Sequence, residues 1–541
     1  MKKLLLFSVM LISVISAKAQ VTVSNGPNLE NDRDNQMNRL LGGDDNSFYC
    51  YRIRSKGRGT SYFVEKYSKA SLKPEFSKEI PMEEDRLTKI EDVQYAADNV
   101  YIFVRSYNKD TKKMTLYYQT VSSTGAVSNK QNEIVYVESD HYEFVDFEIY
   151  PNPSKTKFLI KVFHKENKDD SYKTDFLLIG AKDMKKIWSK RIDSKVGAKS
   201  GISFSFWGMG GGDYTGFIGL FLDDDDNIYY ASSYYASNST DKEKHYKAAV
   251  SIIESKSQEP KTTELAFDED YLVKDVEFSK TPNGEIVVGG FLKDVIERKG
   301  RDLVKVGIFS FTINIASGAV VTKTVKMFDD AMLTALESSA KKSRWYLYKM
   351  DYIFPVGKDV FYVGEQYSEE VVTTYNPQTH TSSTHYDYEY MDVIVAKLNA
   401  KGEFEWIKNT PLRNNLSLGY PHVFKQYIAV PTNSAIYVIN NEHEKNIERY
   451  KAPDFEPKDL KSMSGIHGSN FVYTSVAVSN GALDHELIFN NEDYCFAPIQ
   501  ERNPQFIPPS DTEIFVKGKD NDLYIYTEDR GKDRFTKLTL K

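Results

Sequence analysis

Short apolar stretches and polar turns alternate along the whole chain. A typical unit follows Asp, Asn or Gly, runs through residues rich in Val, Ile, Tyr and Phe, turns, and returns through a second such run. Runs of this kind, bounded by turn-forming residues, predict antiparallel strands joined as hairpins. The paired runs of the nine units begin at these residues: Ser47 and Ser61, Asn99 and Thr115, Lys157 and Asp175, Asn227 and Tyr246, Glu285 and Lys305, Val360 and Asp392, Ala435 and Asn446, Phe471 and His485, Leu523 and Arg534.

The recurrence of one hairpin from end to end predicts the fold class. A unit about every 55 residues predicts an all-β protein built as a single β-propeller of seven or eight four-stranded blades. A pair of β-sandwiches, which also contains many short strands, is the alternative. The last run ends close to the C-terminus, so we expect it to complete a blade begun by the N-terminal segment, which removes an exposed sheet edge. No linker of distinct composition appears, so residues 20–541 are predicted to form one domain.

One segment, residues 329–342, departs from the strand pattern. Acidic residues open it and lysines close it, which complements the dipole of a helix. Leu333 and Leu336 fall on one side of such a helix. The sequence therefore predicts a short amphipathic helix on the rim between two blades.

Residues 1–19 have the features of an export signal. Lys2 and Lys3 precede a short apolar stretch, and Ala17-Lys18-Ala19 is a small-residue cleavage pattern, so Gln20 is the predicted first mature residue. An N-terminal membrane anchor is the alternative, but the apolar stretch is short for a membrane span. We predict an exported protein that is periplasmic or associated with the cell envelope, or else secreted.

Charge and cysteine content narrow the function classes. The formal net charge is −7, and removal of the lysines in the export signal makes it −10. A mildly acidic protein is poorly suited to phosphate backbones, so nucleic acid is not expected as a partner. Cys50 and Cys495 do not make a disulfide scaffold. We favour two separate buried thiols, with a bridge between the chain ends as the alternative.

Residues 392–406, DVIVAKLNAKGEFEW, form the most regular unit. An apolar strand enters a turn, after which two aromatic residues alternate along the next strand. The stretch resembles the β-propeller repeat of exported bacterial proteins, an uncharacterised secreted propeller-like family. The residues that carry the resemblance are Asp392, Val395, Lys397, Leu398, Gly402, Phe404 and Trp406. The resemblance implies a propeller fold and export, and it implies no established activity or catalytic residue.

Two segments have a composition that can bind ions. Asp223, Asp225 and Asn227 alternate as the ligands of calcium loops do, but the glycine and distal glutamate of an EF-hand are absent. Ordinary turn chemistry is favoured, and no metal is predicted. The glycine-rich segment 208–216 completes no phosphate-binding motif and is expected to connect blades. No cofactor is predicted.

The longest hairpin insertion, residues 368–390, carries the candidate binding residues. Tyrosine and histidine offer flat, amphipathic contact area at low entropic cost. We predict that these side chains stand on a polar tip and contact a partner: Tyr375, His380, His385, Tyr386, Tyr388 and Tyr390. Enlarged hairpins at 237–245 and 294–302 are expected on the same face. A ribbon without a ligand is the alternative.

Three functions fit these features. The first is a non-enzymatic propeller that binds an envelope protein or a glycan through the face with the long hairpins. The second is a propeller-type hydrolase or lyase that acts on polysaccharide or peptide, with carboxylates or histidines in the central channel. The third is a structural scaffold of an envelope complex. The sequence favours the first, because it contains no recognisable catalytic motif.

Overall fold

The computed structural model describes most of the chain. The described residues are 21–30, 35–56, 59–82, 85–128, 130–165, 172–192, 216–235, 246–257, 259–269, 271–294, 305–337, 347–379, 381–418, 426–452, 454–463, 469–490, 495–496, 515–529 and 532–541. The predicted export signal and almost all of the glycine-rich segment lie outside them.

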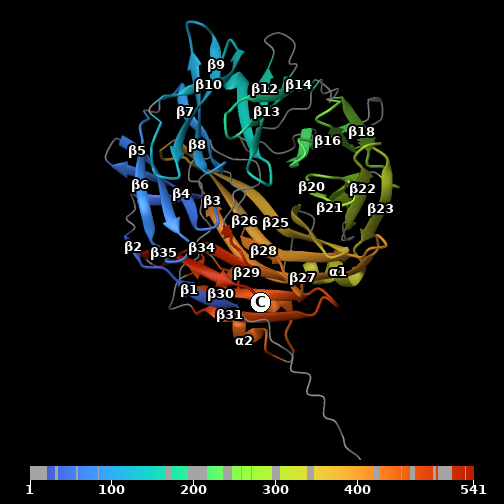
Figure 1. The fold of residues 1–541 in the computed structure, drawn as a ribbon. Helices are drawn as coiled ribbons and strands as arrows, with labels where there is room; N and C mark the ends of the chain where they lie inside the picture. The colour runs from blue at the N-terminus through green and yellow to red at the C-terminus, as the bar shows by residue number, and fades with distance from the viewer. Residues whose placement is uncertain are drawn as a thin grey trace, which may run out of the picture.

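The described residues form eight antiparallel sheets. Figure 1 shows the sheets following one another around a ring in chain order. This all-β arrangement is consistent with an eight-bladed β-propeller, and we call the sheets blades 1 to 8. The predicted all-β class is confirmed, and the number of sheets is the higher of the two predicted.

Blades 1 to 4 contain four strands each. Blade 1 consists of β3 (Asn35–Gly43), β4 (Ser47–Lys56), β5 (Gly59–Ser68) and β6 (Pro74–Ile80), and blade 2 of β7 (Thr88–Ala96), β8 (Asn99–Asn108), β9 (Lys113–Ser122) and β10 (Asn132–Glu138). Blade 3 consists of β11 (Val145–Pro151), β12 (Lys157–Lys165), β13 (Tyr172–Gly180) and β14 (Lys186–Ile192), and blade 4 of β15 (Gly216–Leu222), β16 (Ile228–Tyr235), β17 (Tyr246–Ile253) and β18 (Pro260–Glu264). A short 3-10 helix, η1 (Tyr142–Phe144), leads into blade 3.

Blades 5 to 8 follow the same plan with some strands divided in two. Blade 5 consists of β19 (Tyr271–Leu272), β20 (Glu277–Lys280), β21 (Glu285–Asp294), β22 (Val306–Asn314) and β23 (Val320–Met327), and blade 6 of β24 (Leu347–Val356), β25 (Asp359–Asn376), β26 (Thr381–Leu398) and β27 (Phe404–Leu418). Blade 7 consists of β28 (Tyr427–Pro431), β29 (Ala435–His443), β30 (Ser469–Ala477) and β31 (Leu483–Phe489), and blade 8 contains β32 (Cys495–Phe496), β33 (Phe515–Lys517), β34 (Asp522–Asp529) and β35 (Lys532–Thr539).

The N-terminal segment closes blade 8. β1 (Thr22–Asn25) and β2 (Leu29–Glu30) both pair with β35, which is the last strand of the chain. Figure 1 shows these blue strands beside the red end of the chain. The closure covers the edge of β35 with a partner strand. The predicted joining of the two chain ends in one blade is confirmed.

Nine sequence units become eight blades because two units share blade 7. β29 pairs with β30 over its whole length, from Ala435 opposite Ala477 to His443 opposite Ser469. The segment between them was predicted to contain a strand from Asn446. It instead contains the one-turn helix α2 (Asn446–Arg449) and the 3-10 helix η3 (Pro457–Asp459), so that prediction was wrong. The β29–β30 ladder already supplies the partner that a strand at Asn446 would have needed.

The antiparallel order gives the ring two different faces. Within a blade, short turns join the first strand to the second and the third to the fourth, and we call the face bearing them the turn face. The connections between the second and third strands, and those between blades, lie on the opposite face, which we call the hairpin face. The long β25–β26 hairpin belongs to the hairpin face.

The predicted rim helix is present as α1 (Asp330–Glu337), between blades 5 and 6. The carboxylate of Asp329 accepts a hydrogen bond from the backbone N–H of Met332 at 2.8 Å, which caps the first turn. Leu333 and Leu336 are buried in the cluster that joins the two blades. The predicted residues 338–342 lie outside the described part of the chain.

The regular unit at 392–406 has a structural explanation. Lys397 bridges Asp359 at 3.0 Å and Glu405 at 2.8 Å, so it links three strands of blade 6. Gly402 has a φ of 80°, which a tight turn requires and which glycine adopts without strain. Elsewhere in the ring, Cys50 is a free thiol, and burial raises its pKa well above the ordinary value. The side chain of Cys495 is outside the described set.

Candidate functional site

The first strands of the blades line the middle of the ring. β3, β7, β11, β15, β20 and β24 each contact the first strand of the next blade, and β3 also contacts β33. Each first strand enters from the hairpin face, because the connection from the preceding blade ends there. Charged residues near the beginning of these strands therefore lie around the axis at its hairpin-face end.

Two carboxyl groups and one guanidinium meet at this end of the axis, between blades 2 and 3. Glu91 lies on β7, Asp146 on β11 and Arg105 on β8. Arg105 Nε lies 3.0 Å from Glu91 Oε2, and its NH1 lies 3.5 Å from Asp146 Oδ1. The Glu91 side chain is 10% exposed and the Asp146 side chain 30% exposed. The group is therefore largely desolvated and still open to solvent on the Asp146 side.

The pKa values of both carboxyl groups are raised. Burial raises the pKa of Glu91 to about 8, Arg105 lowers it, and the negative charges of Asp146 and Asp92 raise it again. A hydrogen bond between Glu91 and Asp146 adds to the upward shift. Burial and the nearby Glu148 also raise the pKa of Asp146. With its pKa of about 8, Glu91 is therefore a carboxylic acid near neutral pH, in contact with the Asp146 carboxyl group.

A second charged cluster lies where blades 5, 6 and 7 meet. Lys349 Nζ on β24 lies 3.0 Å from Asp351 Oδ1, and Tyr427 on β28 donates a 2.6 Å hydrogen bond to Asp351 Oδ2. Asp275 accepts a 3.0 Å hydrogen bond from the backbone N–H of Met350. Burial raises the pKa of Asp275 to about 7, although Lys349 opposes the shift. This cluster joins three blades and holds a second carboxyl group that retains a proton well above the ordinary range.

The acidic turn at Asp223 joins blades instead of standing free. Asp223 Oδ2 lies 2.7 Å from Lys280 Nζ of blade 5, and Lys280 also contacts Asp225. On the other side, Asp224 accepts hydrogen bonds from the β11–β12 turn of blade 3, from Asn152 Nδ2 at 2.6 Å and Ser154 N at 3.0 Å. A lysine ammonium thus occupies the position between these carboxylates that a cation would need.

The predicted binding residues on the long hairpin separate into two groups. Tyr375 is 59% exposed, and the imidazole of His385 is half-exposed, 3.6 Å from Asp387. His380 lies outside the described residues. The remaining three, on β26, are buried in the cluster formed with blade 7: Tyr386, Tyr388 and Tyr390.

The placement of these three tyrosines on a polar tip was therefore wrong. β26 continues as a regular strand, so alternate residues point to one side, and Tyr390 stacks on Tyr367 there. β27 pairs with β26 as far as Tyr386 opposite Leu418 and supports this part of the hairpin. Partner binding through Tyr375 and His385 stays a prediction.

The other two enlarged hairpins, 237–245 and the part of 294–302 from residue 295 onwards, lie outside the described residues. The strands that bound them, β16 with β17 and β21 with β22, are the second and third strands of blades 4 and 5. These strand ends lie on the hairpin face, as do those of the β25–β26 hairpin of blade 6. In the view of Figure 1, β25 and β26 run across the middle of the ring.

Sequence reasoning did not find Glu91 and Asp146. Both lie beside apolar residues in strands, in the stretches KIEDV and FVDFEI, where a charged residue is unexpected. That pattern is the available signal, but it cannot show that the two strands belong to adjacent blades.

The sequence matches no family model and no curated protein. Among solved structures, the β-propeller domain of the trilobed protease from Pyrococcus furiosus is 7% identical, with 85% of this chain and 97% of that chain covered and a TM-score of 0.33. The polysaccharide lyase Uly1 is 10% identical, with 95% and 100% covered and a TM-score of 0.35. Dipeptidyl peptidase 4 of Porphyromonas gingivalis is 10% identical, with 84% and 60% covered and a TM-score of 0.33.

In the described part of the chain, no helix is both long enough and apolar enough to span a bilayer.

Proposed function

We propose that this protein is a hydrolase that cleaves peptide bonds at the hairpin-face end of its axis. The observation that carries the proposal is the contact between Glu91 and Asp146, two carboxyl groups with raised pKa values beside Arg105. Perturbed carboxyl groups with a specific charged neighbour are enriched at active sites. Two carboxyl groups in contact suit hydrolysis of a carbonyl group, whereas glycosidases hold theirs roughly 5 to 9.5 Å apart.

The pair supplies both proton transfers of the reaction. The Asp146 carboxylate accepts a proton from water while the water oxygen bonds to the carbonyl carbon, and Glu91 donates its proton to the carbonyl oxygen. When the C–N bond breaks, Asp146 returns its proton to the leaving nitrogen and the diol gives one back to Glu91. Arg105 keeps one negative charge stable throughout. The pair ends in its starting protonation state.

Cleavage of fluorescein-labelled casein tests this proposal. Glu91→Gln and Asp146→Asn should each lower the rate at least about 100-fold, as expected for loss of an acid–base group. Asp175→Asn is the control, because Asp175 lies on β13 in an exposed ion pair with Arg191 at 2.8 Å. The proposal fails if the wild-type protein cleaves neither casein nor a mixed peptide library, or if Glu91→Gln retains the wild-type rate.

A non-enzymatic binding module is the second candidate, and the exposed end of the β25–β26 hairpin favours it. Tyr375 is 59% exposed and Val371 37% exposed there. Deletion of residues 372–384 removes this end and leaves Tyr386 and the core below it in place. If the module binds an envelope protein, the deletion should abolish its capture in a crosslinking pull-down from the cell envelope while the ring stays folded. Export to the envelope is part of both proposals.

A further inference from the structure

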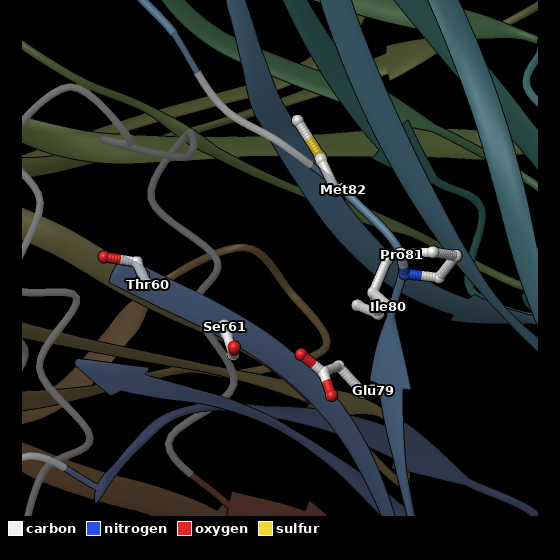
Figure 2. Close-up of a pocket in the computed structure, with 6 residues that line it drawn as sticks. All are labelled: Thr60, Ser61, Glu79, Ile80, Pro81 and Met82. Carbon is white, nitrogen blue, oxygen red and sulfur yellow. The ribbon is translucent and has the colours of Figure 1, made fainter. Parts of the chain in front are cut away.

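A pocket of about 340 Å³ opens at the hairpin-face end of blade 1, away from the axis. Six residues of β5, β6 and the segment after β6 line it: Thr60, Ser61, Glu79, Ile80, Pro81 and Met82. Figure 2 shows the Ser61 hydroxyl and the Glu79 carboxylate directed towards the same gap, with Pro81 and Met82 along another side. The pocket thus joins one acid and two hydroxyl groups to an apolar wall.

The strand register fixes this arrangement. Phe63 on β5 lies directly opposite Glu79 on β6, and Ser61 is two residues from Phe63 along β5. Residues two apart on a strand point to the same side, so Ser61 and Glu79 share one face of the sheet. Ile80 is buried and holds the end of β6 against blade 2. The polar groups are therefore positioned by paired strands and not by a loop.

The Glu79 carboxylate is unpaired within the part of the chain that the structure describes. Among the described residues, no ion pair or hydrogen bond engages its side chain. Arg54 lies opposite Ser61 in the register, but its guanidinium lies over the Phe63 ring at 4.0 Å and 3.4 Å from Glu65. Arg54 is therefore held by other partners, and Glu79 presents its negative charge to the pocket.

We propose that this pocket binds a basic side chain, lysine or arginine, of the peptide substrate, an inference that rests on the proposed peptide hydrolysis. An ammonium group is a donor that suits the Glu79 carboxylate and the hydroxyl of Ser61 on the same face of the sheet. The aliphatic stem of the same side chain covers Pro81 and Met82. The net charge of −7 attracts basic peptides to the protein as a whole.

The pocket and the axial pair lie on the same face of the ring. β6 leaves the pocket at Ile80, and the connection after it leads into β7, which carries Glu91. A peptide bound by a basic residue at blade 1 can therefore extend along the hairpin face towards the axis. The pocket selects the substrate, and the axial pair cleaves it.

Fluorescence anisotropy on two labelled pentapeptides tests the pocket. The peptides carry a central lysine or a central norleucine, and the protein is the full chain with Glu91→Gln, which prevents cleavage. The lysine peptide should bind at least tenfold more tightly, which corresponds to about 1.4 kcal/mol. A further Glu79→Gln change should abolish the preference. The matched control is Glu138→Gln, which changes an exposed acid at the corresponding end of the outer strand in blade 2.

The outcomes separate this inference from the proposed function. Equal binding of the two peptides, or a lysine preference that survives Glu79→Gln, overturns the pocket assignment whether or not casein is cleaved. A lysine preference that depends on Glu79 supports it even if the wild-type protein proves inactive, in which case the hydrolase proposal alone fails.

Discussion

In the turn of blade 4 and at the axis, a pair of carboxyl groups contacts a single cation, and carboxyl pKa values shift in opposite directions at the two places. In the turn of blade 4, Asp223 and Asp225 share Lys280, and hydrogen bonding to that lysine lowers the pKa of Asp225. At the axis, Glu91 and Asp146 share Arg105, yet the pKa values of both are raised. The ratio of charges is the same, so the charge count does not explain the difference.

Solvent and hydrogen-bond donors explain it. The Asp225 side chain is 75% exposed, and the buried Asp223 accepts further hydrogen bonds from the backbone N–H groups of Asp225 and Asn227 and from Tyr229 Oη. Glu91 is 10% exposed and has the guanidinium of Arg105 as its charged donor. At the axis, hydrogen-bond donors and water do not stabilise two negative charges, so the pair is stabilised by keeping a proton. The turn is therefore a structural joint, and the axial pair can exchange protons.

The largest decrease in the free energy of unfolding is expected when Asp223 is removed. Asp223→Ala removes the buried one of the two carboxylates that contact Lys280 and leaves the buried Tyr229 hydroxyl without its acceptor. Breaking a buried ion pair from one side costs roughly 3–5 kcal/mol. Chemical denaturation should show a decrease of this size in the free energy of unfolding. A loss below about 1 kcal/mol would mean that the turn is an ordinary surface loop and would remove the contrast with the axial pair.

The next effect is a pH dependence of stability caused by Glu91. Its pKa is about 8 in the folded protein, against an ordinary value of 4.5, so the folded state holds the proton more tightly. This stabilisation is complete below the unfolded pKa and is lost as the pH rises through about 8. The slope is about 1.4 kcal/mol per pH unit for one proton.

Glu91→Gln isolates this contribution. Between pH 5 and 7, roughly the window that linkage gives, the free energy of unfolding of the wild type should fall relative to that of the variant. Asp275, with a pKa of about 7, adds a similar slope to both proteins and cancels in the difference. If the free energies of unfolding of the two proteins change in parallel with pH, Glu91 is ionised in the folded protein. The axial pair would then be two carboxylates, like Asp223 and Asp225 in the turn.

A smaller change should follow from removing the axial cation. Arg105→Gln takes away the charge that opposes the upward shift of both carboxyl groups. Loss of an opposite charge at this distance raises a carboxyl pKa by about 1 unit or more, equivalent to about 1.4 kcal/mol. Carbon-13 NMR titration of the Glu91 and Asp146 carboxyl carbons measures the shift directly. Unchanged titration midpoints would show that burial alone sets these values.

The sequence predicted the ring and not its chemistry, for a physical reason. Strands and turns are local patterns, so the hairpins and the helix α1 follow from residues that are close in the chain. The closure of blade 8 joins the two ends of the chain, and it was predicted from the rule that a ring leaves no exposed sheet edge. The pair of Glu91 and Asp146 forms only when β7 and β11 pack as neighbouring inner strands. The same holds for Lys280 and Asp223, because the partner of an acidic turn belongs to another blade.

The tyrosines of β26 teach a different lesson. The sequence predicts a polar tip for Tyr386, Tyr388 and Tyr390 because most other residues of the insertion 368–390 are polar. Their alternation is itself the pattern of a strand with one buried side, and the structure buries all three. Polarity averaged over a hairpin hides such a one-sided arrangement, whereas the two-residue period reveals it. The pocket of blade 1, by contrast, left no sequence signal, since its residues come from the ends of two strands.

The smallest effect is expected at the exposed acid of the turn. Asp225→Asn removes one of the two carboxylates that contact Lys280, while Asp223 keeps its other donors. Exposed ion pairs contribute about 0.2–1 kcal/mol and are screened by salt. The free energy of unfolding should therefore fall by no more than this amount in dilute buffer, and the difference should vanish at high ionic strength. A large, salt-independent loss would instead show that Asp225 acts as a structural acid like Asp223. Solvent exposure would then not explain why the pKa values change in opposite directions in the turn and at the axis.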